Sequence, residues 1–482
     1  MQLSQLTDAP RDMEITGITA DSRQVKKGYL FAALPGNKMN GAQFIEDAIM
    51  HGAVAIVAGK GTKLPPGSDA VLLEEENPRK ELSRIASCYY KLQPDVIAAV
   101  TGTSGKTSVV SFTQQLWNLF GITNSASLGT LGVVTNGVTR SGSLTTPDTV
   151  SLHAELADLA AVGVTHLAME ASSHGLDQYR LDGVRVTVAG YTNLSRDHLD
   201  YHETMDAYFA AKARLFSDIL ERQGLAVLNA DDEYFPKLEE ICKKAGHKYF
   251  TYGKNGKDIR LLKRELKPLG QDITLEVMGK KFDVTLPLVG QFQVMNALCA
   301  LGLVLAGDGD VDIITPLLAK LEGVPGRLQL IQGHPKGAAV YVDYAHKPAA
   351  VEAVLNTLRP HTEGRLITIL GCGGNRDKGK RPIMGRIAAG LSDLVIVTDD
   401  NPRYEDPKSI RADILEGAHE AEEIADRREA IEWGIAQLKK GDVLVIAGKG
   451  HEQGQIIGDV VEPFDDVEVT KKTIKHMKAG KK

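Results

Sequence analysis

The sequence predicts an α/β protein whose domains are built on largely parallel sheets. Its apolar runs are short, rich in Val, Ile and Leu, and do not alternate with polar residues. Such runs are typical of strands buried on both faces of a parallel sheet. Longer stretches with helical spacing separate these runs, as expected of βαβ units. The length of 482 residues, at about 150 residues per domain, allows roughly three domains.

Residues able to do chemistry stand at the carboxyl ends of the predicted strands. The strands are expected at residues 96–100, 166–169, 186–191, 339–342, 366–370, 394–397 and 443–447. The residues that follow them are Thr101, Glu170, Thr192, Asp343, Gly371, Thr398 and Gly448. Helical spacing is clearest at residues 151–160 and 348–358. Because open α/β sheets bind ligands beyond the carboxyl ends of their strands, the pattern favours an enzyme with a large cleft.

Three blocks follow one another along the chain, at residues 1–92, 93–325 and 326–482. The first block has its own α/β pattern and ends in a helical stretch at residues 84–91. The Gly/Pro-rich segment at residues 323–326 is typical of a hinge, and the third block opens with a predicted strand. The basic residues 471–482 are expected to form a frayed, solvated end.

Charge and cysteine content exclude several classes of protein. The 56 basic and 62 acidic side chains give a net charge of −6, which has the wrong sign for binding nucleic acid through its phosphates. The four cysteines form no CxxC pair, which argues against a disulfide framework or a zinc ribbon. Residues 1–10 carry no secretory pattern, and the best apolar run, residues 297–306, is shorter than the ~18 residues of a membrane helix. We expect a cytoplasmic protein with no membrane insertion and no nucleic-acid partner.

A glycine-rich phosphate loop follows the first predicted strand of the central block. The sequence TGTSGKTS at residues 101–108 lies between that strand and a helical pattern at residues 109–120. Backbone N–H groups in such a loop point at phosphates, and the helix dipole adds to the attraction. Only the GxxGKT end of the GxxxxGK[ST] motif is present, because position 100 is Val. The alternative is an ordinary turn between a strand and a helix.

The expected nucleotide-binding residues of the loop are Gly102, Thr103, Ser104, Gly105, Lys106, Thr107 and Ser108. Among them, Lys106 would reach the β- and γ-phosphates, and Thr107 would offer its hydroxyl to Mg²⁺.

With ten further motifs, the sequence resembles the Mur ligase family, the ATP-dependent amide-forming enzymes of peptidoglycan precursor synthesis. The motifs are DSR from residue 21, TTPD from 145, MEASSHGL from 169, NLSRDHLDYH from 193, AKARLF from 211, GRLQ from 326, DYAHKP from 343, GCGGNRDKGKRP from 371, DDNPR from 399 and GKGHE from 448. The resemblance covers the whole chain. It implies an N-terminal UDP-MurNAc-binding domain (1–92), a central P-loop ATPase domain (93–325) and a C-terminal Rossmann-like domain that brings the amino acid (326–482).

The resemblance implies that ATP activates a carboxylate as an acyl phosphate, which an amine then displaces. Several anionic groups meet in such a reaction, so cations are needed to neutralise them. Two Mg²⁺ ions are implied, with Thr107, Glu170, His198 and Lys212 as ligands. The matching lysine of the family is carbamylated by CO₂, so a carbamate is expected on Lys212. The implied catalytic residues are Lys106, Glu170, His198 and Lys212.

The local sequence leaves simpler interpretations open for two of these residues. A lysine in a helix such as residues 208–216 is typical of a solvated face, and a histidine such as His198 is typical of a surface or capping residue.

The resemblance also implies which residues contact the rest of the nucleotide and which bind the acid substrate, UDP-MurNAc-L-Ala-D-Glu. Asn296 resembles the asparagine that meets adenine, and Arg327 and Asp343 resemble contacts to phosphate and ribose. Asn296 is also compatible with a helix start, and Arg327 with a solvated loop cation. Hydroxyls and an arginine suit phosphate and carboxylate oxygens. The implied residues for the acid substrate are Ser22, Thr145, Thr146, Ser172, Gln178 and Arg180.

The motif DNPR at residues 400–403 resembles that of the family branch that adds meso-diaminopimelate. Diaminopimelate carries a second amino acid head group that lysine lacks, and an arginine can grip its carboxylate through two hydrogen bonds. The implied amino acid site consists of Arg376, Asp400, Asn401, Pro402, Arg403, Gly448 and Glu452. The alternative for Arg403 is a solvated charge in an Asn-Pro turn. The charged run at residues 376–381 is also typical of a solvated face, although Arg376 follows a strand end.

Other functions remain as alternatives. Within the ligases they are the L-lysine-adding version and folylpolyglutamate synthase, which shares the phosphate loop but lacks a muramyl-binding domain. A P-loop kinase would release a phosphorylated product, and a nucleotide-switched binding module would not need the metal ligands that follow the loop. We expect the diaminopimelate-adding ligase, acting as a monomer.

Overall fold

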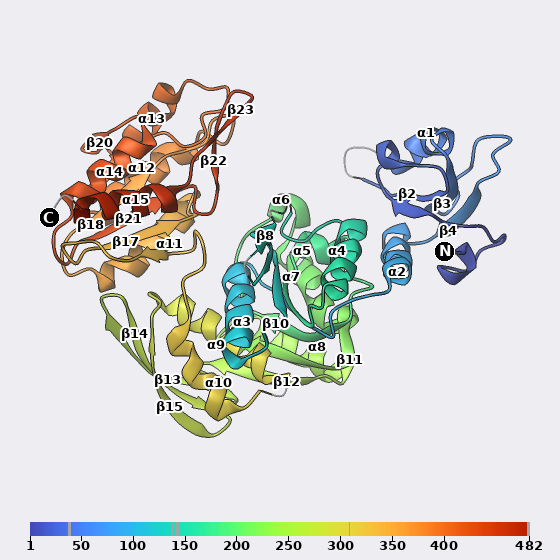
Figure 1. Ribbon diagram of the computed structural model, residues 1–482, viewed down its shortest axis with the longest axis horizontal. Helices are drawn as coiled ribbons and strands as arrows, with labels where there is room; N and C mark the ends of the chain where they lie inside the picture. Colours follow the sequence, from blue (N-terminus) through green and yellow to red (C-terminus); the bar gives the residue numbers. More distant parts are fainter. Residues whose placement is uncertain (37–39, 137, 141, 143, 308, 480–482) are drawn as a thin grey trace. The chain divides into compact units, whose positions relative to one another are not determined.

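The computed structural model describes residues 1–36, 40–136, 138–140, 142, 144–307 and 309–479 (Figure 1). Internal contacts divide the chain into two compact units. Unit 1 comprises Met1–Arg260, Val277–Lys280 and Met295–Thr315, and unit 2 comprises Leu261–Glu276, Lys281–Val294 and Pro316–Lys482. Both units contain parallel strands with helices packed on them, so the predicted α/β class is confirmed.

Unit 1 begins with a parallel sheet of strand order β1-β2-β3-β4. Its strands are β1 (Gly17–Thr19), β2 (Tyr29–Ala33), β3 (Ala53–Gly59) and β4 (Val71–Glu75). Helix α2 (Pro78–Tyr90) buries Leu82 and Ile85 against one face, and α1 (Ile45–Met50) buries Ile45 and Ala48 against the other. Residues alternate between the two cores along each strand, which explains why the strands read as continuous apolar runs.

The central sheet has the strand order β15-β14-β13-β12-β11-β10-β5-β9-β6-β7-β8. Its strands are β5 (Val96–Thr101), β6 (Ser125–Gly129), β7 (Gly132–Thr135), β8 (Val138–Arg140), β9 (His166–Glu170), β10 (Val186–Tyr191), β11 (Leu220–Asn229), β12 (Lys248–Gly253), β13 (Ile259–Lys267), β14 (Gly270–Val277) and β15 (Lys280–Leu286). Strand β5 pairs in parallel with β9 on one side and β10 on the other. The chain therefore reverses its direction of travel across the sheet at β5, and such a switch point is where open α/β sheets bind ligands.

Helices cover both faces of the central sheet. Packed on one face are α4 (Thr149–Ala161), α5 (Ser173–Asp177), α7 (Met205–Arg214) and α8 (Phe235–Ala245). Helix α3 (Lys106–Phe120) packs on β5, β6 and β9, and α9 (Gln291–Leu305) packs on β10, where a Cβ on Gly190 would lie 3.3 Å from Leu303. The remaining helices of unit 1 are α6 (Leu199–His202) and most of α10 (Val311–Leu317).

Unit 2 contains a sheet of strand order β16-β17-β21-β18-β19-β20, parallel except for the pairing of β16 with β17. The strands are β16 (Gln329–Ile331), β17 (Ala339–Asp343), β18 (Leu366–Leu370), β19 (Leu394–Val397), β20 (Glu422–Glu423) and β21 (Val443–Ala447). One face packs on α11 (Pro348–Leu358), α12 (Lys380–Leu391) and α13 (Pro407–Leu415), and the other on α14 (Arg427–Gln437) and α15 (Asp466–Ala479). Figure 1 shows this three-layer arrangement.

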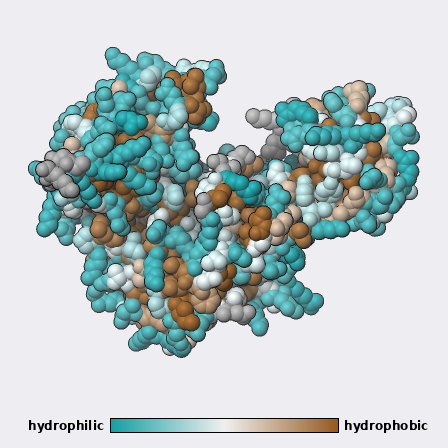
Figure 2. Space-filling view, viewed as in Figure 1, coloured by the Kyte–Doolittle hydropathy of each residue, from teal (hydrophilic) through white to brown (hydrophobic). Residues whose placement is uncertain are grey.

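A hairpin of β22 (Gly454–Ile457) and β23 (Val460–Pro463) follows β21. It exposes Ile457, Val460 and Val461, and Figure 2 shows hydrophobic surface at this hairpin.

The seven predicted strands and the helices predicted at residues 151–160 and 348–358 are present, but the expected frayed tail is wrong. Residues 471–479 continue helix α15, in which Val469 and Ile474 are buried against the sheet. Their helical spacing is hidden among lysines in the sequence. Residues 480–482 lie outside the described part of the chain. Within that part, no helix is long and apolar enough to cross a membrane.

Candidate active site

The phosphate loop lies at the switch point, between β5 and α3. Helix α3 begins at Lys106, and Gly105 is its N-cap. Gly105 and Gly102 have φ angles of +89° and +146°, in a region that L side chains rarely adopt. A Cβ on Gly105 would collide with Oδ1 of Asn296, and a Cβ on Gly102 would collide with Oγ1 of Thr192. Both glycines are therefore required by backbone conformation and by close neighbours.

Asn193, which follows β10, fixes the backbone of the phosphate loop by hydrogen bonds. The N–H of Thr103 donates to the carbonyl of Asn193 (2.8 Å), and the N–H of Ser104 donates to its Oδ1 (3.0 Å). Thr107 and Ser108 follow in the first turn of α3, where backbone N–H groups lack partners within the helix. This arrangement of a glycine turn and a helix N-terminus is suited to binding phosphate.

Two lysines converge on one carbonyl of the loop. The Nζ of Lys106 donates to the Gly102 carbonyl (2.9 Å) and the Nζ of Lys212 to the same oxygen (2.7 Å). Lys212 is only 2% exposed, so the solvated-face interpretation is wrong. Burial, followed by repulsion from Lys106, holds the pKa of Lys212 well below its usual range. Its Nζ also lies 4.5 Å from the centroid of the Tyr208 ring.

Glu170, the last residue of β9, lies in a buried polar cluster with three residues expected to bind the acid substrate. Its Oε1 accepts from the N–H of Thr130 (2.8 Å), and the Thr130 hydroxyl contacts that of Thr145 (3.1 Å). The hydroxyl of Thr146 donates to the Glu170 carbonyl (2.8 Å) and accepts from the N–H of Ser172 (3.0 Å). The structure thus brings Thr145, Thr146 and Ser172 together around Glu170.

Arg180 and Gln178 adjoin this cluster. Arg180 donates to the carbonyl of Thr146 (2.6 Å) and to Oε1 of Gln178 (2.8 Å). The amide of Gln178 donates in turn to the hydroxyl of Tyr201 (3.1 Å). Burial lowers the pKa of Arg180, so an anionic partner would stabilise its charged form.

His198 stands at the start of α6, with a φ of +52°. Its ring centroid lies 5.0 Å from that of His174 and 6.1 Å from that of Tyr208. His202 lies 5.1 Å from the same tyrosine. Burial lowers the pKa of His174 and of His202, which favours the neutral imidazole. The sequence singled out only His198 of this ring cluster.

Asn296 and Ser22 complete the assignments in unit 1. Asn296 lies in the interior of α9, 5% exposed, with its amide against Gly105. The helix-start interpretation is therefore wrong, and the residue faces the phosphate loop. Ser22 lies in a short turn, Ser22–Gln24, that follows β1 in the N-terminal sheet.

The other two residues expected to contact the nucleotide, Arg327 and Asp343, belong to unit 2. Asp343 ends β17, and its oxygens accept from the N–H groups of Leu328 (2.7 Å) and Ala345 (2.8 Å). Burial raises the pKa of Asp343 to about 6. The guanidinium of Arg327 lies 5.1 Å from the centroid of the Tyr344 ring. In this structure Asp343 therefore shapes the loop after its strand.

The collision at Gly105 predicts a strong effect of a single methyl group. We expect Gly105→Ala to weaken nucleotide binding about 10-fold to 100-fold, because overpacking forces the loop and Asn296 apart. Gly121→Ala is the matched control, since Gly121 caps the other end of α3 at φ +103° with open space around it. Titration of each folded variant with a fluorescent ATP analogue makes the comparison. Equal affinities in the two variants would contradict a role for this contact.

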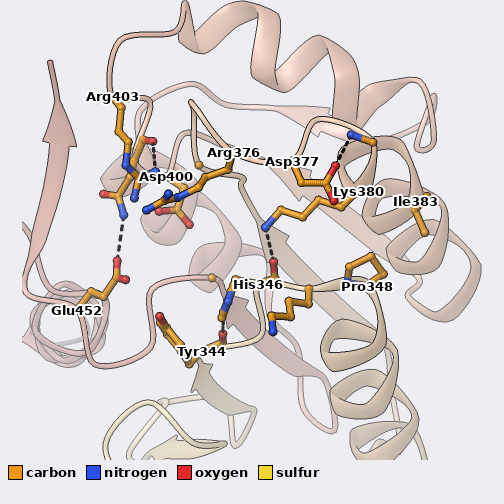
Figure 3. Close-up of a pocket in the computed structure, with 15 residues that line it drawn as sticks. Tyr344, His346, Pro348, Arg376, Asp377, Lys380, Ile383, Asp400, Arg403 and Glu452 are labelled. Atoms are coloured by element: carbon orange, nitrogen blue, oxygen red, sulfur yellow. Dashed lines mark hydrogen bonds between the residues drawn. The ribbon is translucent and has the colours of Figure 1, made fainter. Parts of the chain in front are cut away.

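Unit 2 contains a pocket of about 780 Å³ beside the carboxyl ends of its parallel strands (Figure 3). Six of the seven residues expected to bind the amino acid line it: Arg376, Asp400, Asn401, Arg403, Gly448 and Glu452. The seventh, Pro402, is buried and is not a lining residue. The further lining residues, which the sequence did not assign to the amino acid site, are Tyr344, His346, Lys347, Pro348, Gly373, Asp377, Gly379, Lys380 and Ile383.

Arg403 is held at the edge of the pocket by its backbone. Its φ is +54°, its N–H donates to the carbonyl of Ile456 (3.0 Å), and its carbonyl accepts from the N–H of Gly458 (2.8 Å). One nitrogen of the guanidinium donates to the carbonyl of Gly374 (3.1 Å). The pocket thus combines guanidinium groups with the carboxylates of Asp400 and Glu452, as a zwitterionic ligand requires (Figure 3).

The charged run at residues 376–381 is divided between the pocket and the core. Arg381 is fully buried and pairs with Glu405 (3.0 Å) and Asp413 (2.8 Å), so a solvated face is wrong for this residue. Lys380 donates to the carbonyl of His346 (2.7 Å) at the pocket wall.

Three family models match the chain in order. They are the Mur ligase family catalytic domain at residues 14–90, the Mur ligase middle domain at 100–304 and the Mur ligase glutamate ligase domain at 326–450. A UDP-N-acetylmuramoyl-L-alanyl-D-glutamate–2,6-diaminopimelate ligase of Rhizobium meliloti (strain 1021) is 50% identical over 463 residues, which cover 96% of this chain and 95% of that protein. The chain belongs to the Mur ligase family. The identically named protein of Brucella melitensis biotype 1 is 51% identical over 455 residues, 94% of this chain and 93% of that protein.

Mur ligase architecture is also found in a solved structure of a UDP-N-acetylmuramoyl-L-alanyl-D-glutamate–2,6-diaminopimelate ligase. It matches with a TM-score of 0.73 and 36% identity, covering 96% of this chain and 95% of that chain. The three-domain α/β fold expected from the sequence is therefore confirmed. In this Mur ligase, the phosphate loop and Glu170 lie in unit 1, and the pocket around Arg403 lies in unit 2.

Proposed function

We propose that the chain uses ATP to join meso-diaminopimelate to the γ-carboxylate of the D-glutamate in UDP-MurNAc-L-Ala-D-Glu. The carboxylate attacks the γ-phosphate of ATP to form an acyl phosphate, and the amine of diaminopimelate displaces phosphate from it. The products are UDP-MurNAc-tripeptide, ADP and phosphate, in peptidoglycan precursor synthesis. The observation that carries the proposal is the pocket of unit 2, where Arg403 and Glu452 face a space suited to an amino acid head group.

ATP fits the phosphate loop of unit 1. The N–H groups at the N-terminus of α3 attract the phosphates, and Lys106 neutralises their charge. Asn296 borders the same loop through Gly105. Arg327 and Asp343 are proposed as further contacts to the nucleotide, supported by the family resemblance of their motifs.

The residues near the loop also suit Mg²⁺. Within the described residues, no three His, Cys, Asp or Glu side chains cluster closely enough to hold a metal by themselves. Mg²⁺ needs no such cluster, because it usually takes one or two protein oxygens and completes its shell with water and phosphate oxygens. We therefore propose that Thr107 and Glu170 hold one Mg²⁺, and that His198 with a modified Lys212 holds a second. When bound, the two ions would neutralise charge on the transferring phosphoryl group.

The environment of Lys212 supports its proposed carbamylation. Burial favours the neutral amine, and only a neutral amine attacks CO₂. The nitrogen lone pair bonds to the carbon of CO₂ as one C=O π bond opens onto its oxygen, and the nitrogen gives a proton to water, which leaves an anionic carbamate. The Gly102 carbonyl that now accepts from Nζ would accept from the carbamate N–H. Lys212 would thereby change from a neutral amine into an anionic ligand for Mg²⁺.

The acid substrate is proposed to bind beside Glu170. The hydroxyls of Thr145 and Ser172 and the guanidinium of Arg180 offer donors to phosphate and carboxylate oxygens. Thr146, whose own hydroxyl donates to the Glu170 carbonyl, is proposed to support this site from beneath. Gln178 positions Arg180 through their hydrogen bond. Ser22, in the N-terminal block, is proposed for the uridine side. The proposed domains have bounds 1–92, 93–325 and 326–482.

The proposal is tested by phosphate release with purified protein, ATP, Mg²⁺ and UDP-MurNAc-L-Ala-D-Glu. We expect phosphate release to require both the dipeptide substrate and an amine, and meso-diaminopimelate to exceed L-lysine by up to ~10⁴-fold in kcat/KM, because a site built for a second head group is left unpaired by lysine. Light scattering on the same sample tests the expected monomer. Release without any amine would point to a kinase or an ATPase. Efficient use of L-lysine would replace the proposal with its lysine-adding alternative.

A further inference from the structure

Lys449 is a buried lysine in the loop after β21. Its side chain does not line the proposed diaminopimelate pocket but contacts residues that do. It is 0% exposed, although lysine is almost never fully buried without partners. It lies between Gly448 and Gly450, whose φ angles are +118° and +57°. A Cβ on Gly448 would lie 2.6 Å from Oδ2 of Asp400, so this loop is pressed against the DNPR motif. The sequence contained the residue within the GKGHE motif but gave no sign of its burial.

The ammonium group of Lys449 joins three segments of unit 2. Its Nζ donates to Oδ1 of Asn401 (2.7 Å) in the DNPR motif and to the carbonyl of Gly454 (2.8 Å) at the start of the β22–β23 hairpin. It also lies 3.4 Å from Oδ1 of Asp400 and 3.9 Å from Oε2 of Glu452. Three of these four partners line the pocket.

The Asn401 side chain depends on this contact for its orientation. Its Oδ1 accepts from Lys449 and from the N–H of Ile456 (2.9 Å), while its amide nitrogen donates to Oε2 of Glu452 (3.0 Å). Two donors on the oxygen leave only one orientation in which the nitrogen meets Glu452. Lys449 therefore sets the position of the Glu452 carboxylate through Asn401.

The charge of Lys449 also balances the pocket wall. Asp400 and Glu452 are carboxylates in a partly buried site, and burial followed by Asp400 raises the pKa of Glu452. A second buried cation, Arg427, already forms a bidentate pair with Asp466 (2.8 Å). Lys449, by contrast, lies close to the carboxylates of both Asp400 and Glu452 and balances their charge.

We propose that Lys449 is a positioning residue for the amino acid substrate, which fixes Asn401 and Glu452 in the arrangement that receives the second head group of diaminopimelate. The inference rests on the function proposed above. It adds a residue that does not line the pocket and acts only through residues that do. The β22–β23 hairpin belongs to the same network. Its Gly454 carbonyl accepts from Lys449, and Ile456 donates to Asn401 and accepts from the backbone of Arg403.

Lys449→Met tests the proposal, because methionine keeps the length of the side chain but removes its charge and donors. We expect the KM for diaminopimelate to rise about 10-fold to 100-fold, while the KM values for ATP and for UDP-MurNAc-L-Ala-D-Glu stay within about twofold. Lys449→Gln keeps a donor for Asn401 without the charge, so its KM for diaminopimelate should fall between those of the wild type and the methionine variant. Thermal unfolding and light scattering verify that each variant is folded.

Arg365→Met is the matched control. Arg365 pairs with Asp442 (2.7 Å) ahead of β18 and β21, at the edge of the sheet opposite the pocket. Its substitution should leave all three KM values unchanged. A folded Lys449→Met enzyme with an unchanged KM for diaminopimelate would overturn the proposal, as would a rise in all three KM values together. If Lys449→Met does not fold, an unchanged KM in Lys449→Gln decides against the proposal. Failure of the wild type to use diaminopimelate would instead reject the proposed function.

Discussion

Replacing Lys212 with alanine is expected to lower kcat by about 10²-fold to 10³-fold, and acetate is expected to restore part of the lost activity. The loss corresponds to removing one group that stabilises charge in the transition state. Rescue is expected because the substitution empties a buried space beside Tyr208, in which the side chain now lies with 2% exposure. A small carboxylate entering that space would supply the anion that the carbamate provides. Initial rates at increasing acetate concentration measure the effect.

Lys106→Ala provides the matched control for this rescue. Both lysines donate to the carbonyl of Gly102, but Lys106 acts as a cation toward the phosphates. Its loss should therefore not be repaired by an anion. Carbon-13 NMR of the protein in labelled bicarbonate gives a readout independent of turnover, with a carbamate signal expected in the wild type and absent from Lys212→Ala. Equal rescue of both variants, or no signal in the wild type, would contradict the carbamate.

Arg403→Ala is expected to lower kcat/KM for diaminopimelate about 10²-fold to 10⁴-fold with little change in the affinity for ATP. The guanidinium is proposed to bind the carboxylate of the second head group through paired hydrogen bonds, which alanine cannot make. Steady-state kinetics with each substrate varied in turn, together with nucleotide titration, separate the two effects.

Discrimination against L-lysine should fall in the same variant, because lysine never used the lost contact. Arg386→Ala, which removes an exposed arginine from α12, is the control and should behave like the wild type. Arg403→Lys should recover little, since an ammonium group cannot reproduce the planar pair of donors. A parallel loss of ATP affinity and diaminopimelate use would show that Arg403 supports the fold of unit 2 and not substrate choice.

The parallel strands were predictable because burial on both faces leaves a local trace in the sequence. Strands β5, β10, β18 and β21 read as continuous apolar runs for this reason. Strands β13 to β15 were not predicted. Their buried residues alternate with charged ones, as in the burial of Ile259 and Leu261 on either side of the exposed Arg260, and such patterns are short and weak. The last helix was missed because four lysines surround its two buried apolar residues, Val469 and Ile474.

Chemical groups in the site were easier to predict than their environments. The motifs identified Lys212 and Arg403, but the local sequence favoured solvated positions for both. Burial of Lys212 depends on α7 packing beside the phosphate loop, which lies 110 residues away along the chain at Gly102. Lys449 and the ring cluster around His198 depend in the same way on contacts between distant segments. Tertiary packing determines whether a lysine is a solvated surface charge or a buried group with an altered pKa and specific partners.

The end of the chain has a part in the pocket that its composition conceals. Asp466, the first residue of α15, holds Arg427 through two hydrogen bonds of 2.8 Å, and Arg427 donates to the carbonyl of Ala447 (3.0 Å), next to Gly448 of the pocket. The C-terminal helix therefore supports the loop that carries Gly448, through Asp466 and Arg427. A truncation that removes α15 would leave the buried guanidinium of Arg427 without its partner and would destabilise the wall of the amino acid site.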